Sequence, residues 1–431
     1  MTVYRWVVPF LIGVLMGGVM MGTAAGQTAP AADRDSSQHP NEVPYATERS
    51  VAYHVLAAPA YVLHGVTRPL GWGVQYAEQN FTTLFSVDRP PRGIIPLVEL
   101  GGPAGFLGGA ALYDNQLFGT RQSARIEGLY GGPDTFKGRA SYDWPRPFGA
   151  GTQFSLRADF FSDASSDFFL GGNDSDRAAD LGAFKRDQLD VTASLSATGP
   201  DRRLRGQVDL LYEHSETAPG TGADGARLAQ ADPEGLGTVD LLTTRVLLGL
   251  DRTTGRPRTY RGVEAILRLG YTQDLTSDRF RYGRYVAEVR HYLPVGFFPT
   301  SRRLVLRGRL EQVEPLFDGE AVPFYQRPAL GGQNLVRGFR SNRFQEAGSL
   351  VLNAEYRYPI WMNWDALVFA DAGQVFPALS DVAADRFRWS YGGGIHMLNQ
   401  KGLSFRFEVA GSAEGVRTIL TVQPTFRRLA R

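Results

Sequence analysis

A two-residue alternation of apolar and polar side chains, repeated in short runs along most of the sequence, constrains the fold of this chain more than any other feature. In residues 153–160, the sequence QFSLRADF alternates polar and apolar side chains without interruption. Residues 350–358 and 403–409 show a similar pattern, and clusters of Gly, Pro, Asp and Asn separate such runs. Alternation with this period places one kind of side chain on each face of a strand. We therefore predict an all-β fold.

The same alternation occurs in soluble β-sandwiches, because one face of an antiparallel sheet is often wet. Three features favour a transmembrane β-barrel instead. The runs are about ten residues long, which is the length of a tilted membrane-spanning strand. Tyr and Phe lie near the ends of the runs, as they do at membrane interfaces, and the first residues of the chain resemble an export signal. Because lipid cannot satisfy an open sheet edge, we expect the strands to close on themselves.

The expected architecture is a 16-stranded antiparallel transmembrane β-barrel over residues 92–431, preceded by a short N-terminal segment. An even strand number is typical of bacterial single-chain barrels. Three connections predicted to face outward are long, at 162–186, 214–240 and 313–348, whereas most inward connections are short. The predicted strands are 94–100, 105–113, 123–130, 136–143, 152–161, 187–196, 204–213, 241–250, 262–272, 284–293, 303–312, 349–358, 365–375, 388–397, 402–410 and 416–426.

Residues 1–26 are predicted to be a signal peptide. Arg5 precedes an uncharged apolar run over 6–22, and the small residues Thr-Ala-Ala-Gly follow at 23–26. This order matches the charged region, apolar region and cleavage site of exported proteins. The alternative is a retained anchor helix, but the run is only about 17 residues long and contains Pro9, so cleavage is favoured.

Residues 27–91 are predicted to be a periplasmic linker with an amphipathic segment. Residues 50–67 carry no formal charge, and Pro59 interrupts them, so we expect an interfacial element rather than a membrane span. Val, Leu and Trp side chains recur through 50–79, and such a segment should not stay free in water. We expect it to bind the barrel mouth or the inner leaflet.

Composition excludes several functional classes. The chain has 46 Lys and Arg and 44 Asp and Glu, a net charge of +2, which gives no electrostatic case for nucleic acid. It has no Cys, which excludes disulfides, thiolate metal sites, a cysteine nucleophile and a lipid-modified cysteine anchor. The six His are scattered without ligand spacing, and there is no G-x-S-x-G or phosphate-binding loop. We therefore expect no catalytic residues, no metal and no cofactor.

Two motifs in the last third of the chain carry the clearest functional signal. The predicted sixth outward connection contains ALGGQNLVRGF over 329–339, and VFADAGQVF follows at 368–376. Together they resemble the BamA and TamA superfamily of outer-membrane insertases and translocases, also called the bacterial surface antigen barrel. Arg337-Gly338-Phe339 matches the family's loop tripeptide. The family's F-x-D-x-G strand is matched by Phe369, Asp371 and Gly373.

The resemblance implies that this connection folds into the lumen. Phe369, Asp371 and Gly373 share one face of their strand, and Glu355 lies on the charged face of another strand. If the connection folds inward, Arg337 meets Glu355 and Asp371, whose carboxylates would offset the desolvation of its guanidinium. Gly338 and Gly373 would allow close backbone approach, whereas the alternative is a connection that stays outside and leaves ordinary wall charges.

Two prolines suggest a weak seam in the barrel. Pro96 and Pro424 lie inside the first and last predicted strands, and no other predicted strand contains an internal proline. Proline lacks the N–H that a strand ladder requires. The first and last strands must pair to close the barrel, so missing ladder bonds there would ease lateral opening; alternatively, both prolines lie at strand ends outside the membrane.

The resemblance implies a non-enzymatic protein of the bacterial outer membrane that assists the insertion or translocation of proteins, or of lipids. Its expected partners are outer-membrane lipids, client outer-membrane or exported proteins, and a periplasmic partner. Residues 27–91 are too short for the family's periplasmic POTRA modules, so client capture by this chain needs another explanation. The alternatives are a porin-like channel and a structural surface protein.

Overall fold

A computed structural model describes residues 91–102, 105–132, 135–176, 180–255, 260–295, 302–361, 364–399 and 402–422. The predicted signal peptide, nearly all of the predicted linker over 27–91, and Pro424 lie outside these residues. The assignments made for them, and the limit of the barrel at 431, stay predictions. Within the described residues, no helix is both long and apolar enough to cross a membrane.

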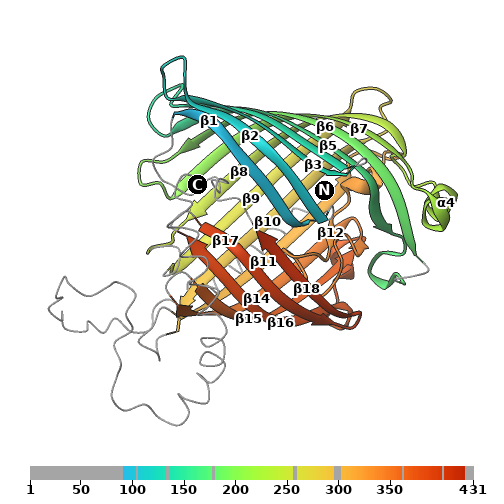
Figure 1. The fold of residues 1–431 in the computed structure, drawn as a ribbon. Coiled ribbons are helices and arrows are strands. Elements are labelled where there is room, and N and C mark those ends of the chain that lie inside the picture. Colours follow the sequence, from blue (N-terminus) through green and yellow to red (C-terminus); the bar gives the residue numbers. More distant parts are fainter. Residues whose placement is uncertain are drawn as a thin grey trace, which may run out of the picture.

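Sixteen strands form a closed antiparallel barrel, in which neighbours along the chain are neighbours in the wall and β1 meets β18 (Figure 1). The first eight are β1 Arg92–Gly102, β2 Gly105–Leu117, β3 Gln122–Gly132, β4 Thr135–Pro145, β5 Thr152–Phe169, β6 Leu181–Thr198, β7 Leu204–Pro219 and β8 Gly237–Asp251. The others are β9 Gly262–Asp274, β10 Arg281–Pro294, β11 Arg303–Pro315, β14 Gly348–Trp361, β15 Trp364–Phe376, β16 Arg388–Asn399, β17 Gly402–Ser412 and β18 Gly415–Val422.

The smaller elements lie in the connections on one side of the barrel, which we call the outer side. They are the helix α4 Gly222–Ala231, the strands β12 Ala329–Leu330 and β13 Phe344–Gln345, and the 3-10 turns η1 Gly172–Asp174, η2 Phe324–Gln326, η3 Leu379–Asp381 and η4 Ala384–Arg386. We refer to the connections 170–180, 220–236, 316–347 and 377–387 as loops 3, 4, 6 and 7.

All sixteen predicted strands are confirmed, but several continue further outward than predicted. The predicted connections 162–186, 214–240 and 313–348 were too long, because β5 runs to Phe169, β6 starts at Leu181 and β7 runs to Pro219. Above the membrane the apolar face is no longer required, so the alternation fades while the ladder continues. The ten-residue helix α4 was not predicted, because it is shorter than three turns and Gly begins it.

The two faces of the wall differ as the alternation predicts. Large apolar side chains on the outer surface are exposed along the strands, among them Ile94, Leu112, Ile126, Val368 and Tyr391. Their sequence neighbours face the lumen and are largely charged in β4, β5, β10, β11 and β14. An apolar outer surface and a charged lumen are what a lipid-embedded barrel requires.

The seam between β1 and β18 is described in part. Among the described residues it is seen as one pair, Leu100↔Val422, and in this antiparallel register the partners of the earlier residues of β1 would have numbers above 422, outside the described residues. Pro96 lies in β1, as predicted. The proline argument itself needs correction, because β14 also contains Pro359, beside a register shift near its inner end. Proline therefore does not single out the seam strands, and a weak seam stays a prediction.

Candidate functional site

Three strands from one part of the wall, β14, β15 and β17, place the carboxylates of the site on its inner face, with β16 between the last two. Glu355 lies on β14, Asp371 on β15 and Glu408 on β17. The register Glu355↔Phe369 and Asp371↔Ser390 keeps these side chains on one side of the sheet. The exposed apolar side chains of Val368 and its neighbours point the other way. The strand alternation alone thus gathers several acids at one place in the lumen.

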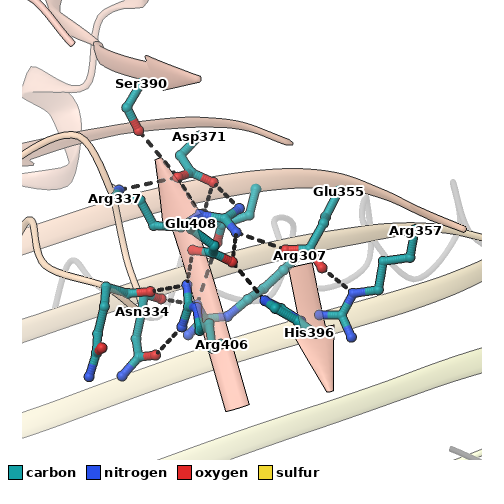
Figure 2. Close-up of polar contacts among 12 residues, drawn as sticks. Arg307, Asn334, Arg337, Glu355, Arg357, Asp371, Ser390, His396, Arg406 and Glu408 are labelled. Carbon is teal, nitrogen blue, oxygen red and sulfur yellow. Dashed lines mark hydrogen bonds and ion pairs between the residues drawn. The ribbon is translucent and has the colours of Figure 1, made fainter. Parts of the chain in front are cut away.

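Loop 6 brings Arg337 into this acidic region, as Figure 2 shows. Its Nε and Nη2 atoms donate to the two oxygens of Asp371 at 2.9 and 2.8 Å. Its Nη1 donates to Glu355 at 2.8 Å and to Glu408 at 3.2 Å. The predicted contact of Arg337 with Glu355 and Asp371 is therefore present, and loop 6 lies in the lumen. We call Arg337 and these three acids the Arg337 cluster.

The cluster is buried, and its acids have further partners. Asp371 and Glu408 are fully buried, and Arg337 is only 5% exposed. Asp371 also accepts bonds from the backbone N–H of Arg337 and from Ser390. Arg406 donates to Glu408 at 2.6 Å, and Arg357 pairs with Glu355. Three guanidinium groups therefore face three carboxylates, which is the pairing that buried charges require.

The environment stabilises the charged form of Arg337. Burial alone would lower the pKa of its guanidinium, but the hydrogen bonds and charges of Asp371, with Glu355 and Glu408, raise that pKa above its usual value. The guanidinium carbon also lies 3.4 Å from the centre of the Phe369 ring. A planar cation between an aromatic face and a bidentate carboxylate is held in one orientation.

The two predicted glycines lie where other residues approach the backbone too closely for a side chain. A Cβ on Gly338 would lie 2.7 Å from the Cβ atoms of Ser390 and Ser412, and one on Gly373 would lie 2.5 Å from Leu330. Phe339 is buried and packs edge-on against Phe344 at 5.3 Å. In the tripeptide, Arg337 thus supplies the cation, Gly338 allows close packing and Phe339 anchors the loop in an apolar contact.

A second attachment holds loop 6 at η2, further back along the loop. The Phe324 ring is fully buried and lies 4.8 Å from Phe168 and 4.9 Å from Phe184. The Gln326 amide donates to both oxygens of Glu213 on β7, at 2.9 and 2.7 Å. Arg284 on β10 donates to the Gln326 side-chain oxygen at 3.0 Å. We call this the Gln326 attachment.

A polar ladder on the inner wall connects the two attachments. Its rungs follow the order Arg284, Glu311, Arg309, Glu288 and Arg307, each bonded to the next. Arg307 then donates to the Asn334 backbone oxygen of loop 6 at 2.6 Å. The inner wall of β10 and β11 therefore supports the loop between its two ends.

Sequence reasoning missed several of these residues. Glu408 lies on the polar face of a predicted strand, so the alternation could have predicted that its side chain faces the lumen. The Gln326 attachment had no such signal, because Glu213 and Gln326 are 113 residues apart. Within the described residues, no group of three or more His, Cys, Asp or Glu could hold a metal ion.

Comparisons with known proteins agree with this fold. A family model described as the Omp85 superfamily domain matches residues 116–411. BamA from Haemophilus ducreyi lacking POTRA domains 1-3 has a TM-score of 0.59 at 16% identity, over 78% of this chain and 70% of that chain. CdiB from Escherichia coli has a TM-score of 0.51 at 10% identity, over 78% of this chain and 63% of that chain.

These structural likenesses concern the fold. No curated protein sequence matches the chain. The family match extends from β2 to β17 and includes loop 6 with its Arg337 cluster. The chain therefore belongs to the Omp85 superfamily and is a β-barrel protein of the bacterial outer membrane.

Proposed function

We propose that this protein is a non-enzymatic outer-membrane barrel that assists the insertion or translocation of client proteins. The observation that carries the proposal is loop 6, which enters the lumen and binds the wall through a buried, bidentate arginine. The charges that line an open pore face water, whereas the Arg337 cation is buried among three acids. Such a cluster is costly to desolvate and is retained where one conformation must be specified.

The seam belongs to the same proposal. Its described part is the register pair Leu100↔Val422, close to Pro96 of β1. Opening a sheet costs about 0.5–1.5 kcal/mol for each ladder bond that is lost. Where β1 parts from β18, a client strand could pair with the exposed edge. The clients would be outer-membrane or exported proteins, and outer-membrane lipids would border the seam.

The N-terminal segment is the proposed docking region for a periplasmic partner. Residues 27–91 precede β1 directly, so a protein bound there would lie beside the seam. A pull-down with the full chain and with a deletion of residues 50–79 would identify such a partner.

The test of the proposed function combines two measurements on the full protein in liposomes. The first is single-channel conductance, where we expect low and irregular currents because loop 6 occupies the lumen. The second is the folding rate of a urea-unfolded small outer-membrane barrel protein added to the same liposomes, which the protein should raise. Steady, large conductance steps with no effect on folding would show a porin-like channel and overturn the proposal.

A further inference from the structure

Loop 6 contains a second buried arginine, Arg343, that the resemblance does not point to. Arg343 is 2% exposed, less than Arg337. Its guanidinium carbon lies 4.7 Å from the centre of the Phe169 ring and 4.5 Å from that of Phe344. The guanidinium is therefore in contact with two aromatic rings, one from β5 and one from loop 6 itself.

The polar atoms of Arg343 join two other parts of the chain. Nε donates to Glu414 at 2.6 Å, in the turn between β17 and β18. Nη2 donates to the backbone oxygen of Ser175 in loop 3 at 2.8 Å, and Nη1 donates to the Ser175 hydroxyl. Ser175 is 168 residues away along the chain, so one side chain connects three distant segments.

Loop 3 is itself held firmly, which makes it a fixed point. The Asn173 side chain accepts a bond from the Val375 backbone N–H at 3.2 Å and donates to the Arg386 backbone oxygen at 3.0 Å. Asp174 pairs with Arg386 at 2.7 Å and with Arg388 at 3.2 Å. The connection from Arg343 to Ser175 therefore ends on a braced loop, whereas the connection to Glu414 ends on the last hairpin.

The last hairpin borders the seam. Its strand β18 is described as far as Val422, which pairs with Leu100 of β1. Inside the lumen, loop 6 contacts the hairpin through Ser412, which donates to Gly338 O at 2.9 Å, and through Thr421, which bonds Gln333 at 2.7 Å. Arg343 adds a charge-assisted bond at the outer turn.

We propose that Arg343 is a positioning residue for the seam, holding the β17–β18 hairpin against loop 3 from the outer side. An apolar side chain would fill the space between Phe169 and Phe344 without the cost of burying a charge. Arginine instead supplies a fork that reaches both Glu414 and Ser175 at once. The inference rests on the proposed function for its purpose, but its geometry can be tested without it.

The test uses distances between spin labels in the full protein in lipid nanodiscs. The chain has no Cys, so Ser165→Cys on β5 and Ala413→Cys in the last turn give two unique labels. Glu414→Gln removes the charge from the hairpin end and leaves the bonds to Ser175. We expect it to raise the displaced hairpin population about tenfold, a change equivalent to ~1.4 kcal/mol.

Two further variants separate positioning from general loop stability. Arg340→Gln is the matched control, because Arg340 lies on the same loop and pairs with Asp167 on β5 at 3.1 Å, away from the hairpin. It should leave the label distance unchanged. The second variant combines Arg343→Gln with Glu414→Gln. This double variant should displace the hairpin no more than Arg343→Gln alone, because each single substitution already removes the bond between the two residues.

The outcomes are distinct for the two proposals. An unchanged label distance in Glu414→Gln and Arg343→Gln, or an equal change in Arg340→Gln, overturns the role of Arg343. A displaced hairpin with an unchanged client folding rate in liposomes supports the positioning role and counts against the proposed function. A displaced hairpin with a changed client folding rate supports both.

Discussion

The wall between β5 and β6 and the seam between β1 and β18 close the same ring in different ways. β5 and β6 have 18 residues each and stay in register from Thr152↔Ala197 to Phe169↔Leu181, with one irregularity. β1 has 11 residues, β18 is described from Gly415 to Val422, and the described part of the seam is one register pair, Leu100↔Val422. The first junction has a long backbone ladder and meets loop 6 at its outer end, where Phe324 packs on Phe168 and Phe184. The described part of the seam strand β18 meets loop 6 through Thr421.

The difference shows which interactions each junction depends on. Loop 6 reaches the seam side through Gln333, Gly338 and Arg343, which bond Thr421, Ser412 and Glu414 respectively. Its own position depends on the Arg337 cluster. A change near Arg337 should therefore alter the seam side more than the β5–β6 wall, which keeps its long ladder.

A disulfide across the seam should have the largest effect. Leu100→Cys with Val422→Cys places two thiols at the paired positions, and the chain contains no other Cys. If opening of the seam is part of function, oxidation should abolish client folding in liposomes and reduction should restore it. The control pair Ala158→Cys with Val191→Cys across β5 and β6 should leave activity intact. Full activity with the seam disulfide closed would rule out opening at this place.

Arg337→Ala should have the next largest effect. It leaves Asp371, Glu355 and Glu408 buried without their shared cation, and breaking such a pairing costs about 3–5 kcal/mol. We expect loop 6 to become protease-sensitive and the heat-resistant folded band on gels to weaken. Arg337→Lys keeps the charge and loses the fork, so its loss should be intermediate. Wild-type protease resistance and activity in Arg337→Ala would refute the role of the cluster.

Gln326→Glu should have a moderate effect on the other end of the loop. The substitution sets a second carboxylate against Glu213, where the amide now donates two bonds, and Arg284 offsets the repulsion only in part. A loss of about 1–3 kcal/mol is expected in thermal unfolding. Gln116→Glu, at an exposed position in β2, is the control and should change little. An equally small effect at both positions would show that η2 is not an attachment.

Arg139→Gln should have the smallest effect. Arg139 pairs with Asp159 across β4 and β5, but the two side chains are 33% and 28% exposed. Partly exposed ion pairs contribute about 0–1 kcal/mol. The backbone ladder should hold this wall in the variant, with unchanged heat resistance on gels. A loss comparable to that of Arg337→Ala would mean that the wall, like the seam, depends on side chains.

The strands could be predicted because they follow a local rule, and alternation located all sixteen. Parity placed Glu355 on the charged face of one strand and Asp371 with Phe369 and Gly373 on one face of another. The meeting of both acids with Arg337 was implied by the resemblance to the BamA and TamA superfamily. The outer strand ends were missed because the alternation weakens above the membrane, as at Ser165 and Ser166 in β5. Pro359 was placed outside its strand because proline normally ends a ladder. The strand β14 continues through it because proline is tolerated beside a bulge.

The rest of the site depends on contacts that leave no local pattern. Arg343 has no distinguishing neighbour in the sequence, since its partners Ser175 and Glu414 are 168 and 71 residues away. The same holds for the Gln326 attachment. Only the path of loop 6 through the lumen brings these groups together, and that path is set by the whole barrel.

The two attachments of loop 6 have a geometric consequence. Loop 6 is bound to β7 through Gln326 and to β14 through Arg337, so it crosses the lumen and holds these two parts of the wall at a fixed distance. The curvature of the wall between them is therefore fixed. The contacts of loop 6 described above fall on β5–β7, β10, β11 and β14–β18. A ring that deforms under the lateral pressure of lipid should then change shape mainly along the arc from β1 to β4. On this geometry β18 is the stationary edge of the seam and β1 is the edge that moves.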